Sequence, residues 1–170
     1  MKNAAMAARN ANDYPAACQI QPLYLETQTL VERLHRRLLD VIEDELHRRN
    51  QFAINAVQAL LIYNVGDREL SASELRSRGC YLGSNVSYNI KKLVELGFLN
   101  HQRSRVDRRG VRIKLTAAGH DVCNIVAQLY RKHADTVEQV GDMNAQEIVS
   151  LNRSLQRLER FWVDQVMYRL

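Results

Sequence analysis

Apolar residues return at helical spacing over most of the chain. From Leu23 to Asn50 they fall every three or four positions, which predicts one amphipathic helix with Pro22 in its first turn. At about 1.5 Å per residue this helix is roughly 40 Å long. That length exceeds what a small domain needs for its own core, so the apolar stripe suggests a dimer partner. Similar spacing predicts long helices over Thr116 to Gly141 and Asn144 to Val166.

The middle of the chain is built from shorter segments. A helix is predicted over Asn55 to Gly66, and two more follow over Ser71 to Arg78 and Ser84 to Leu96. A hairpin is predicted from Phe98 to Leu115, because apolar and basic residues alternate in its second half. Two short helices followed by a hairpin are the order of a helix-turn-helix with a β-wing. We therefore predict a mainly α fold with six helices and a small β-wing.

Most of the predicted helices begin at capping sequences. In a capping box, Asn or Ser is followed three residues later by Gln or Glu, and each side chain accepts a bond from the backbone N–H of the other residue. Thr116 is expected to cap the helix after the hairpin, and Gly97 to end the helix before it. The predicted boxes pair Asn55 with Gln58, Ser71 with Glu74, and Asn144 with Glu147.

The basic residues are concentrated in the predicted winged region. The chain has 170 residues, a net charge of +5 and a pI of about 9.3; 46% of its residues are hydrophobic and 25% charged, an ordinary globular composition. The stretch 71–115 holds 10 Lys/Arg and 3 Asp/Glu, whereas the other 125 residues hold 14 and 16. A phosphate-binding surface requires such a local surplus of positive charge. This distribution predicts double-stranded DNA as the partner.

The pattern divides the chain into regions with different expected roles. Residues 1–20, rich in Ala and Asn, are predicted to be a flexible arm, with a partly helical arm as the alternative. Residues 51–116 are predicted to form the winged DNA-binding lobe, and 21–50 together with 117–170 a helical dimerisation region. The start of the chain carries no run of large apolar residues, so neither a signal peptide nor a membrane span is expected. The expected location is the cytoplasm.

The helix from Ser84 has two faces of different character. Its apolar residues Val86, Ile90, Leu93 and Leu96 are expected on the buried side. The opposite side carries small polar and tyrosine side chains suited to base edges, followed by lysines suited to phosphates. A solvated helix face is the simpler interpretation, and the neighbouring basic hairpin favours DNA. The predicted DNA-contacting residues are Ser84, Asn85, Ser87, Tyr88, Asn89, Lys91 and Lys92.

The hairpin is strongly basic around its tip. From Asn100 to Lys114 there are six Lys/Arg and one acid. An exposed ribbon tipped with arginine fits a DNA minor groove, whose negative potential attracts guanidinium groups. Asp107 is expected to pair with Arg109 and fix its direction; the alternative is a solvated hairpin with a surface ion pair. The predicted wing residues are Arg103, Arg105, Asp107, Arg108 and Arg109.

Three motifs in this region resemble the MarR family of bacterial winged-helix regulators. They are the run LVELGFL over Leu93 to Leu99, the triplet Asp107-Arg108-Arg109, and Val111 to Leu115 followed by Thr116 and Gly119. The resemblance covers roughly Leu23 to Val166. It implies a triangular homodimer whose terminal helices interlock. It also implies that the helix from Ser84 enters the major groove, and that Arg109, oriented by Asp107, enters an adjacent minor groove.

The resemblance further implies a function and a mode of control. It indicates a sequence-specific transcriptional regulator, expected to be a repressor, that binds a pseudo-palindromic operator because half-sites follow the two-fold symmetry of a homodimer. Tyr88 and Asn89 depart from the family's usual residues, so base preference is not carried over. Family members commonly bind small aromatic or phenolic ligands in a cleft between the dimer helices and the DNA lobe. Candidates for its lining, each also explicable as core or interface, are Gln28, His35, Tyr63 and Tyr130.

Two alternatives use the same fold. In a cysteine-based redox sensor the reactive thiol would be Cys18, expected before the first long helix, or Cys80, just before the recognition helix; a small apolar residue is the simpler role for either. A winged-helix protein-interaction module is the second alternative, and the concentrated positive charge argues against it. An enzyme is not expected, because the five histidines form no H-E-x-x-H motif. Three widely spaced cysteines predict neither a disulfide framework nor a metal site, and no cofactor is expected.

Overall fold

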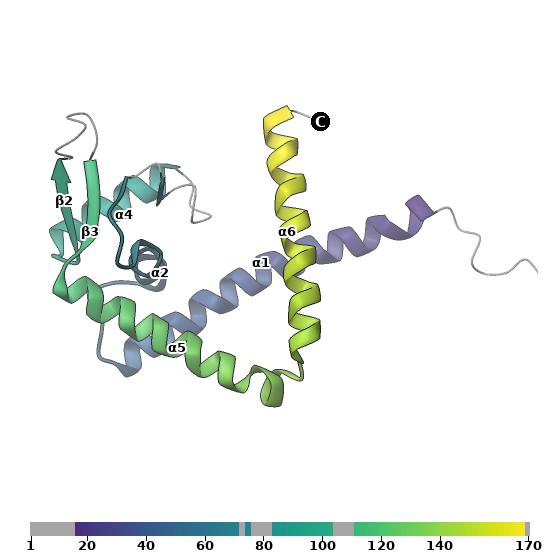
Figure 1. Cartoon of the computed structure of the whole chain (residues 1–170), viewed down its shortest axis with the longest axis horizontal. Helices are drawn as coiled ribbons and strands as arrows, with labels where there is room; N and C mark the ends of the chain where they lie inside the picture. Colours follow the sequence, from purple (N-terminus) through teal and green to yellow (C-terminus); the bar gives the residue numbers. More distant parts are fainter. Residues whose placement is uncertain (1–15, 72–73, 76–82, 104–110, 169–170) are drawn as a thin grey trace, which may run out of the picture.

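The computed structural model describes residues 16–71, 74–75, 83–103 and 111–168, which are mainly helical (Figure 1). The described helices are α1 (Ala16–Arg48), α2 (Ala56–Val65), α4 (Gly83–Glu95), α5 (Ala117–Gly141) and α6 (Ala145–Tyr168). The strands are β1 (Leu70–Ser71), β2 (Leu99–Arg103) and β3 (Val111–Leu115). Five helices thus stand against the six expected. The difference is the predicted helix over Ser71 to Arg78, of which the described part includes Glu74 and Leu75, both helical.

The strands form one antiparallel sheet in the order β1-β3-β2. β2 and β3 make the predicted hairpin, with Leu99 opposite Leu115. The alternation in β3 is confirmed, because Ile113 and Leu115 are buried. β1, which pairs Leu70 with Ile113, was not predicted, since a strand of two residues is too short to show a period. It ties the wing to the chain just before Glu74.

One apolar core joins the sheet to the helices around it. Leu61 and Ile62 of α2 and Leu93 of α4 are fully buried in it. Near the C-terminal end of α1, Ile42 and Leu46 are buried in the same core. Burial of each such side chain contributes about 1.5–3 kcal/mol. Figure 1 shows the resulting lobe of α2, α4 and the strands on one side, with α5 leading away from it to α6. The core therefore holds the wing and α4 in a fixed relation to α1, α2 and α5.

The predicted capping boxes are present. Asn55 Oδ1 accepts from the Gln58 N–H at 3.0 Å, and Gln58 Oε1 accepts from the Asn55 N–H at 3.2 Å. Thr116 Oγ1 accepts from the Gly119 N–H at 3.1 Å and begins α5. The other two boxes join Ser71 with Glu74 and Asn144 with Glu147.

The end of α4 is set by Gly97, as predicted. Its φ is +80°, in the left-handed region that glycine tolerates. The N–H groups of Gly97 and Phe98 bond back to the carbonyls of Val94 and Leu93, at 3.0 and 2.9 Å, which is the Schellman arrangement. Leu96 is 38% exposed, so its expected place on the buried side is wrong. It lies beyond the last helical residue, where the chain turns away from the core.

α1 begins earlier than predicted. Its first residue is Ala16, so Pro22 lies inside the helix, and residues 16–20, expected in the flexible arm, are helical. Cys18 consequently lies within α1 and does not precede it. Proline is most common in a first turn, which is why the sequence pointed to a start at Pro22. The helix continues past it although Pro22 has no N–H to donate to the carbonyl of Cys18.

α6 and the first half of α1 are poorly covered. α6 has no buried residue, and it crosses α1 where Trp162 Nε1 donates to the Tyr24 hydroxyl at 2.9 Å and Phe161 packs edge-on against Tyr24. None of the described helices combines the length and hydropathy of a membrane span. The large exposed apolar residues of these two helices include Leu23, Leu30, Leu34, Leu38, Leu151, Leu155, Phe161 and Val166.

Candidate DNA-binding interface

α4 presents the two faces predicted for a recognition helix. Its inner face enters the core through Val86, Ile90 and Leu93. Its outer face carries Ser87, Tyr88 and Lys91, and Tyr88 is 67% exposed. Ser84 and Asn85 lie in the first turn of α4, and their side chains are outside the described residues. The exposed Ser87 and Tyr88, followed by the exposed Lys91 and Lys92, suit a helix that meets base edges and then phosphates.

The two lysines of α4 share one acid. Lys91 Nζ and Lys92 Nζ lie 4.0 and 3.9 Å from the carboxylate oxygens of Glu95. Exposed ion pairs at such distances are weak and exchange readily with solvent ions. This end of α4 therefore keeps a positive surface that a phosphate can approach.

Asn89 is held differently from its neighbours. Gln58 Nε2, from the start of α2, donates to Asn89 Oδ1 at 3.2 Å. Gln58 is buried, and Asn89 is half-buried at the edge of α4. The carbonyl of the Asn89 side chain therefore faces α2. The sequence predicts this residue among the DNA contacts.

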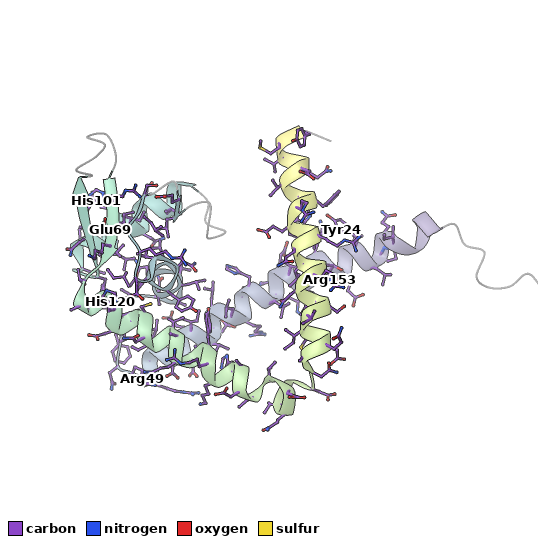
Figure 2. All side chains as sticks on the ribbon, viewed as in Figure 1. Tyr24, Arg49, Glu69, His101, His120 and Arg153 are labelled. Carbon is purple, nitrogen blue, oxygen red and sulfur yellow. The ribbon has the colours of Figure 1, made fainter. Side chains whose placement is uncertain are left out.

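The two basic residues of β3 have acidic partners. Arg112 Nη1 lies 3.0 Å from Glu74 Oε2, and Lys114 Nζ lies 3.8 Å from Glu69 Oε1. Glu69 and His101 lie on the same lobe (Figure 2). Arg103 ends β2, with its side chain outside the described residues; Arg105, Asp107, Arg108 and Arg109, including the expected Asp107–Arg109 pair, also lie outside them.

Glu74 connects the wing to the helix-turn-helix. Its Oε2 accepts from the Ser71 N–H at 2.7 Å and from Arg112 Nη1 at 3.0 Å. The sequence indicated the first contact through the capping box and gave no signal for the second, because Arg112 is 38 residues away. The same carboxylate thus caps a helix and fixes the side chain of Arg112 on β3.

A groove lies between α4 and the sheet. Its volume is ≈ 420 Å³, within the range of small-molecule sites. Most of the surface of its wall is apolar, and its lining residues also contribute a hydroxyl, a carboxylate, an ammonium group and an imidazole. Such a lining suits a small molecule with an aromatic body and a polar or anionic group. The lining residues are Ser87, Ile90, Lys91, Val94, Glu95, His101 and Ile113.

The residues predicted to line a ligand cleft are only partly brought together. Tyr63 of α2 and Tyr130 of α5 form an edge-to-face pair with ring centroids 5.1 Å apart, packed against the core. Burial, together with the neighbouring Tyr63, raises the pKa of the Tyr130 hydroxyl. Gln28 is half-buried and His35 exposed on α1, and their residue numbers place both nearer the N-terminal end of that helix than Leu39, where it reaches the core.

The thiol that the structure describes best is Cys123 of α5. It is free and half-buried, and burial followed by the nearby Asp67 carboxylate raises its pKa. Asp67 also lies 3.5 Å from Nδ1 of His120. Cys80 lies outside the described residues, and the side chain of Cys18 is not described. Among the described residues, no group of three or more His, Cys, Asp or Glu is placed to hold a metal ion.

Comparisons with known proteins agree with this architecture. Residues 54–119 match a family described as a winged helix DNA-binding domain. The exopolysaccharide II synthesis transcriptional activator ExpG of Rhizobium meliloti is 30% identical over 145 residues, which cover 85% of this chain and 74% of that protein.

Solved structures show the same fold. Streptococcus pneumoniae FabT in complex with DNA has a TM-score of 0.64 at 22% identity, covering 83% of this chain and 98% of FabT. Staphylococcus aureus MarR in complex with salicylate and kanamycin has a TM-score of 0.67 at 18% identity, covering 89% and 99%. The matched domain, the sequence relative and the shared fold confirm the resemblance seen in the sequence: the chain belongs to the MarR family of winged-helix, DNA-binding transcription regulators.

Proposed function

We propose that this regulator binds a pseudo-palindromic operator as a homodimer. The proposal rests on one observation: two helices, α1 and α6, extend from the winged lobe and have exposed apolar faces. α6 has no buried residue, and Leu30, Leu34 and Leu38 of α1 are exposed on one side of that helix. Extended apolar surface of this kind marks protein–protein contact. A two-fold interface would present two lobes and require two half-sites.

DNA contact is assigned to α4 and the wing. The outer face of α4, with Ser87, Tyr88 and the two lysines, would enter the major groove, and Ser84 and Asn85 would lie at its leading end. The wing tip, with Arg109 oriented by Asp107, would enter the minor groove. The basic surplus of the 71–115 stretch supports this assignment over a protein-interaction module.

Selection of binding sites from random-sequence DNA tests the proposal. The expected product is a pair of inverted half-sites about one helical turn apart. Arg109→Ala should weaken binding to the selected duplex and reduce the salt dependence of its affinity. Arg33→Ala is the matched control, because it removes one positive charge from α1, outside the lobe. Selection of a single unrepeated site, or equal effects of the two variants, would refute the proposal.

The direction of regulation follows from where the operator lies relative to a promoter. Repression is the outcome expected from the family resemblance. The relative in Rhizobium meliloti is named an activator, and that name favours activation as a second candidate for this chain. A reporter gene behind the promoter nearest a selected site, measured with and without the protein, distinguishes the two.

The groove between α4 and the sheet is our candidate site for a small aromatic effector. Its apolar wall would pack against an aromatic ring. Lys91 and His101 also line the groove and would bind an acidic or phenolic group. A ligand there would touch the recognition helix directly. The salicylate complex of the Staphylococcus aureus protein supports this chemical class.

A thermal-shift screen with benzoates and phenols, followed by loss of DNA binding, tests the effector proposal. Val94→Phe fills the groove and should abolish the shift. Tyr130→Phe, which changes the alternative tyrosine site, should retain it. The reverse pattern would move the effector to the pair formed by Tyr63 and Tyr130.

A further inference from the structure

Gln58 is the only buried polar or charged side chain recorded among the described residues, with 7% of its surface exposed. A buried amide loses its water and must find partners inside the protein. Gln58 finds one at each end. Its Oε1 accepts from the Asn55 N–H at 3.2 Å, and its Nε2 donates to Asn89 Oδ1 at 3.2 Å.

The capping box decides which way this amide faces. Because the Asn55 N–H is a donor, only the oxygen of Gln58 can meet it, and the NH₂ group must face α4. The atom of Asn89 that meets that NH₂ group must in turn be its oxygen. The start of α2 thereby determines the orientation of a side chain on the recognition helix.

The start of α2 is itself tied to α1. Glu43 Oε2 accepts from the Ala56 N–H, the first of α2, at 2.6 Å. A carboxylate at a helix N-terminus is favoured by the helix dipole, and its bond to a backbone N–H is stronger than a neutral one. Directional contacts therefore run without a gap from α1, through the first turn of α2, to Asn89.

Apolar packing alone would leave α4 less well defined. Val86, Ile90 and Leu93 hold its inner face by burial of apolar area, which is non-directional and selects the rotation of the helix less sharply than a hydrogen bond does. Functional side chains must be placed within about 0.5 Å and 10–20° to act specifically. A hydrogen bond at Asn89, adjacent to the exposed Tyr88, restricts that rotation where base contacts are assigned.

We propose that Gln58 is a positioning residue for DNA recognition, which fixes the rotation of α4 through Asn89 relative to α1 and α2. The inference rests on the proposed role of α4 in sequence-specific binding. Gln58 then acts through Asn89, and the neighbours of Asn89 on the outer face of α4 carry the base contacts. Loss of the bond should reduce discrimination between sequences more than it reduces general affinity for DNA.

A double-mutant cycle tests the coupling. The full-length variants Gln58→Met and Asn89→Leu and their combination are titrated against a duplex selected by the wild-type protein and against a scrambled duplex of the same length and composition. Each single variant should lower the ratio of the two affinities about tenfold, the scale of one hydrogen bond. The double variant should also lose about tenfold, because both substitutions remove the same hydrogen bond, the one between Gln58 and Asn89. A loss near a hundredfold would show independent contacts and overturn the proposal.

Two further variants separate positioning from folding. Asn55→Ala removes the cap of α2 but keeps the backbone N–H that Gln58 accepts, so it should lower Tm and leave the affinity ratio unchanged. Asn89→Asp keeps an acceptor for Gln58 and should keep the ratio while weakening binding to both duplexes. A ratio that falls with Tm in Asn55→Ala would make the role of Gln58 merely structural. If the wild-type protein does not prefer the selected duplex, the proposed operator binding fails as well; if it does and Gln58→Met retains that preference, only the positioning role fails.

Discussion

Gly119 lies directly against the backbone carbonyl of Phe98, so closely that a Cβ atom at residue 119 would overlap with that oxygen. Thr116 fastens the same place: its N–H donates to the Phe98 carbonyl at 3.1 Å, and its hydroxyl donates to the Gly97 carbonyl at 2.7 Å. The start of α5 is thus bound to the turn where α4 passes into β2. The Thr-x-x-Gly pattern that resembled the family in the sequence therefore connects the end of α4, the start of β2 and the start of α5.

Gly119→Ala should destabilise the protein by at least about 2 kcal/mol, because the added methyl group meets a backbone atom that Thr116 prevents from moving. Chemical denaturation followed by circular dichroism measures the free energy of unfolding. Gly141→Ala is the matched control. Its nearest neighbour would be a methyl carbon of Val137 at 3.3 Å, at the exposed end of α5. Equal losses in the two variants would contradict the close approach.

The sequence predicted local features of this fold well. Capping boxes, the turn at Gly97 and the alternation of β3 depend on residues a few positions apart, so their signals survive without knowledge of the tertiary structure. The buried face of α4 followed from the same short-range pattern, with Leu96 as the exception at the helix end. Pro22 shows the opposite case, because a strong local preference was overridden and α1 continued through it.

Contacts between distant segments gave no such signal. The pairing of β1 with β3, the Arg112–Glu74 ion pair and the Gln58–Asn89 bond each join residues separated by 31 or more positions. The charge count over 71–115 also gave no sign of which cations are paired. Glu69 stands just before that stretch and lies 3.8 Å from Lys114, and Glu74 inside it pairs with Arg112. Which cations face DNA depends on these pairs, which only the folded chain reveals.

Lys91→Ala should therefore reduce the salt dependence of DNA affinity more than Arg112→Ala does. The side chain of Lys91 is 80% exposed and lies 4.0 Å from its acid, whereas Arg112 donates to Glu74 at 3.0 Å. Loss of one phosphate contact makes the negative slope of log affinity against log salt shallower by about 0.9. Fluorescence anisotropy over a salt series measures both slopes. A larger change for Arg112→Ala would indicate that β3, rather than α4, contacts the DNA backbone.

Leu34→Glu should convert the proposed dimer to a monomer and weaken operator binding. Leu34 is 62% exposed in the middle of the apolar stripe of α1. In the proposed dimer a carboxylate at this position would lose its water to an apolar interface. Sedimentation velocity measures the change in mass, and anisotropy measures the loss of affinity. Arg36→Glu is the control, since residue 36 lies about 200° further around the helix. A Leu34→Glu protein with the mass of the wild type would exclude this stripe from the interface.

Cys123 should be a slow-reacting thiol, which argues against a redox role for this residue. Burial and then the Asp67 carboxylate raise its pKa, so little of the reactive thiolate exists near neutral pH. In a Cys18→Ser, Cys80→Ser background, iodoacetamide should modify it more slowly than a free cysteine, with a rate that rises as pH approaches its raised pKa. Asp67→Asn should accelerate the reaction by removing the second cause, while burial keeps it below the rate of a free thiol. Any stability linked to the protonated thiol is present below its ordinary pKa and lost as pH rises through the raised value. Modification as fast as that of free cysteine at neutral pH would contradict this assignment and add Cys123 to the candidate sensors.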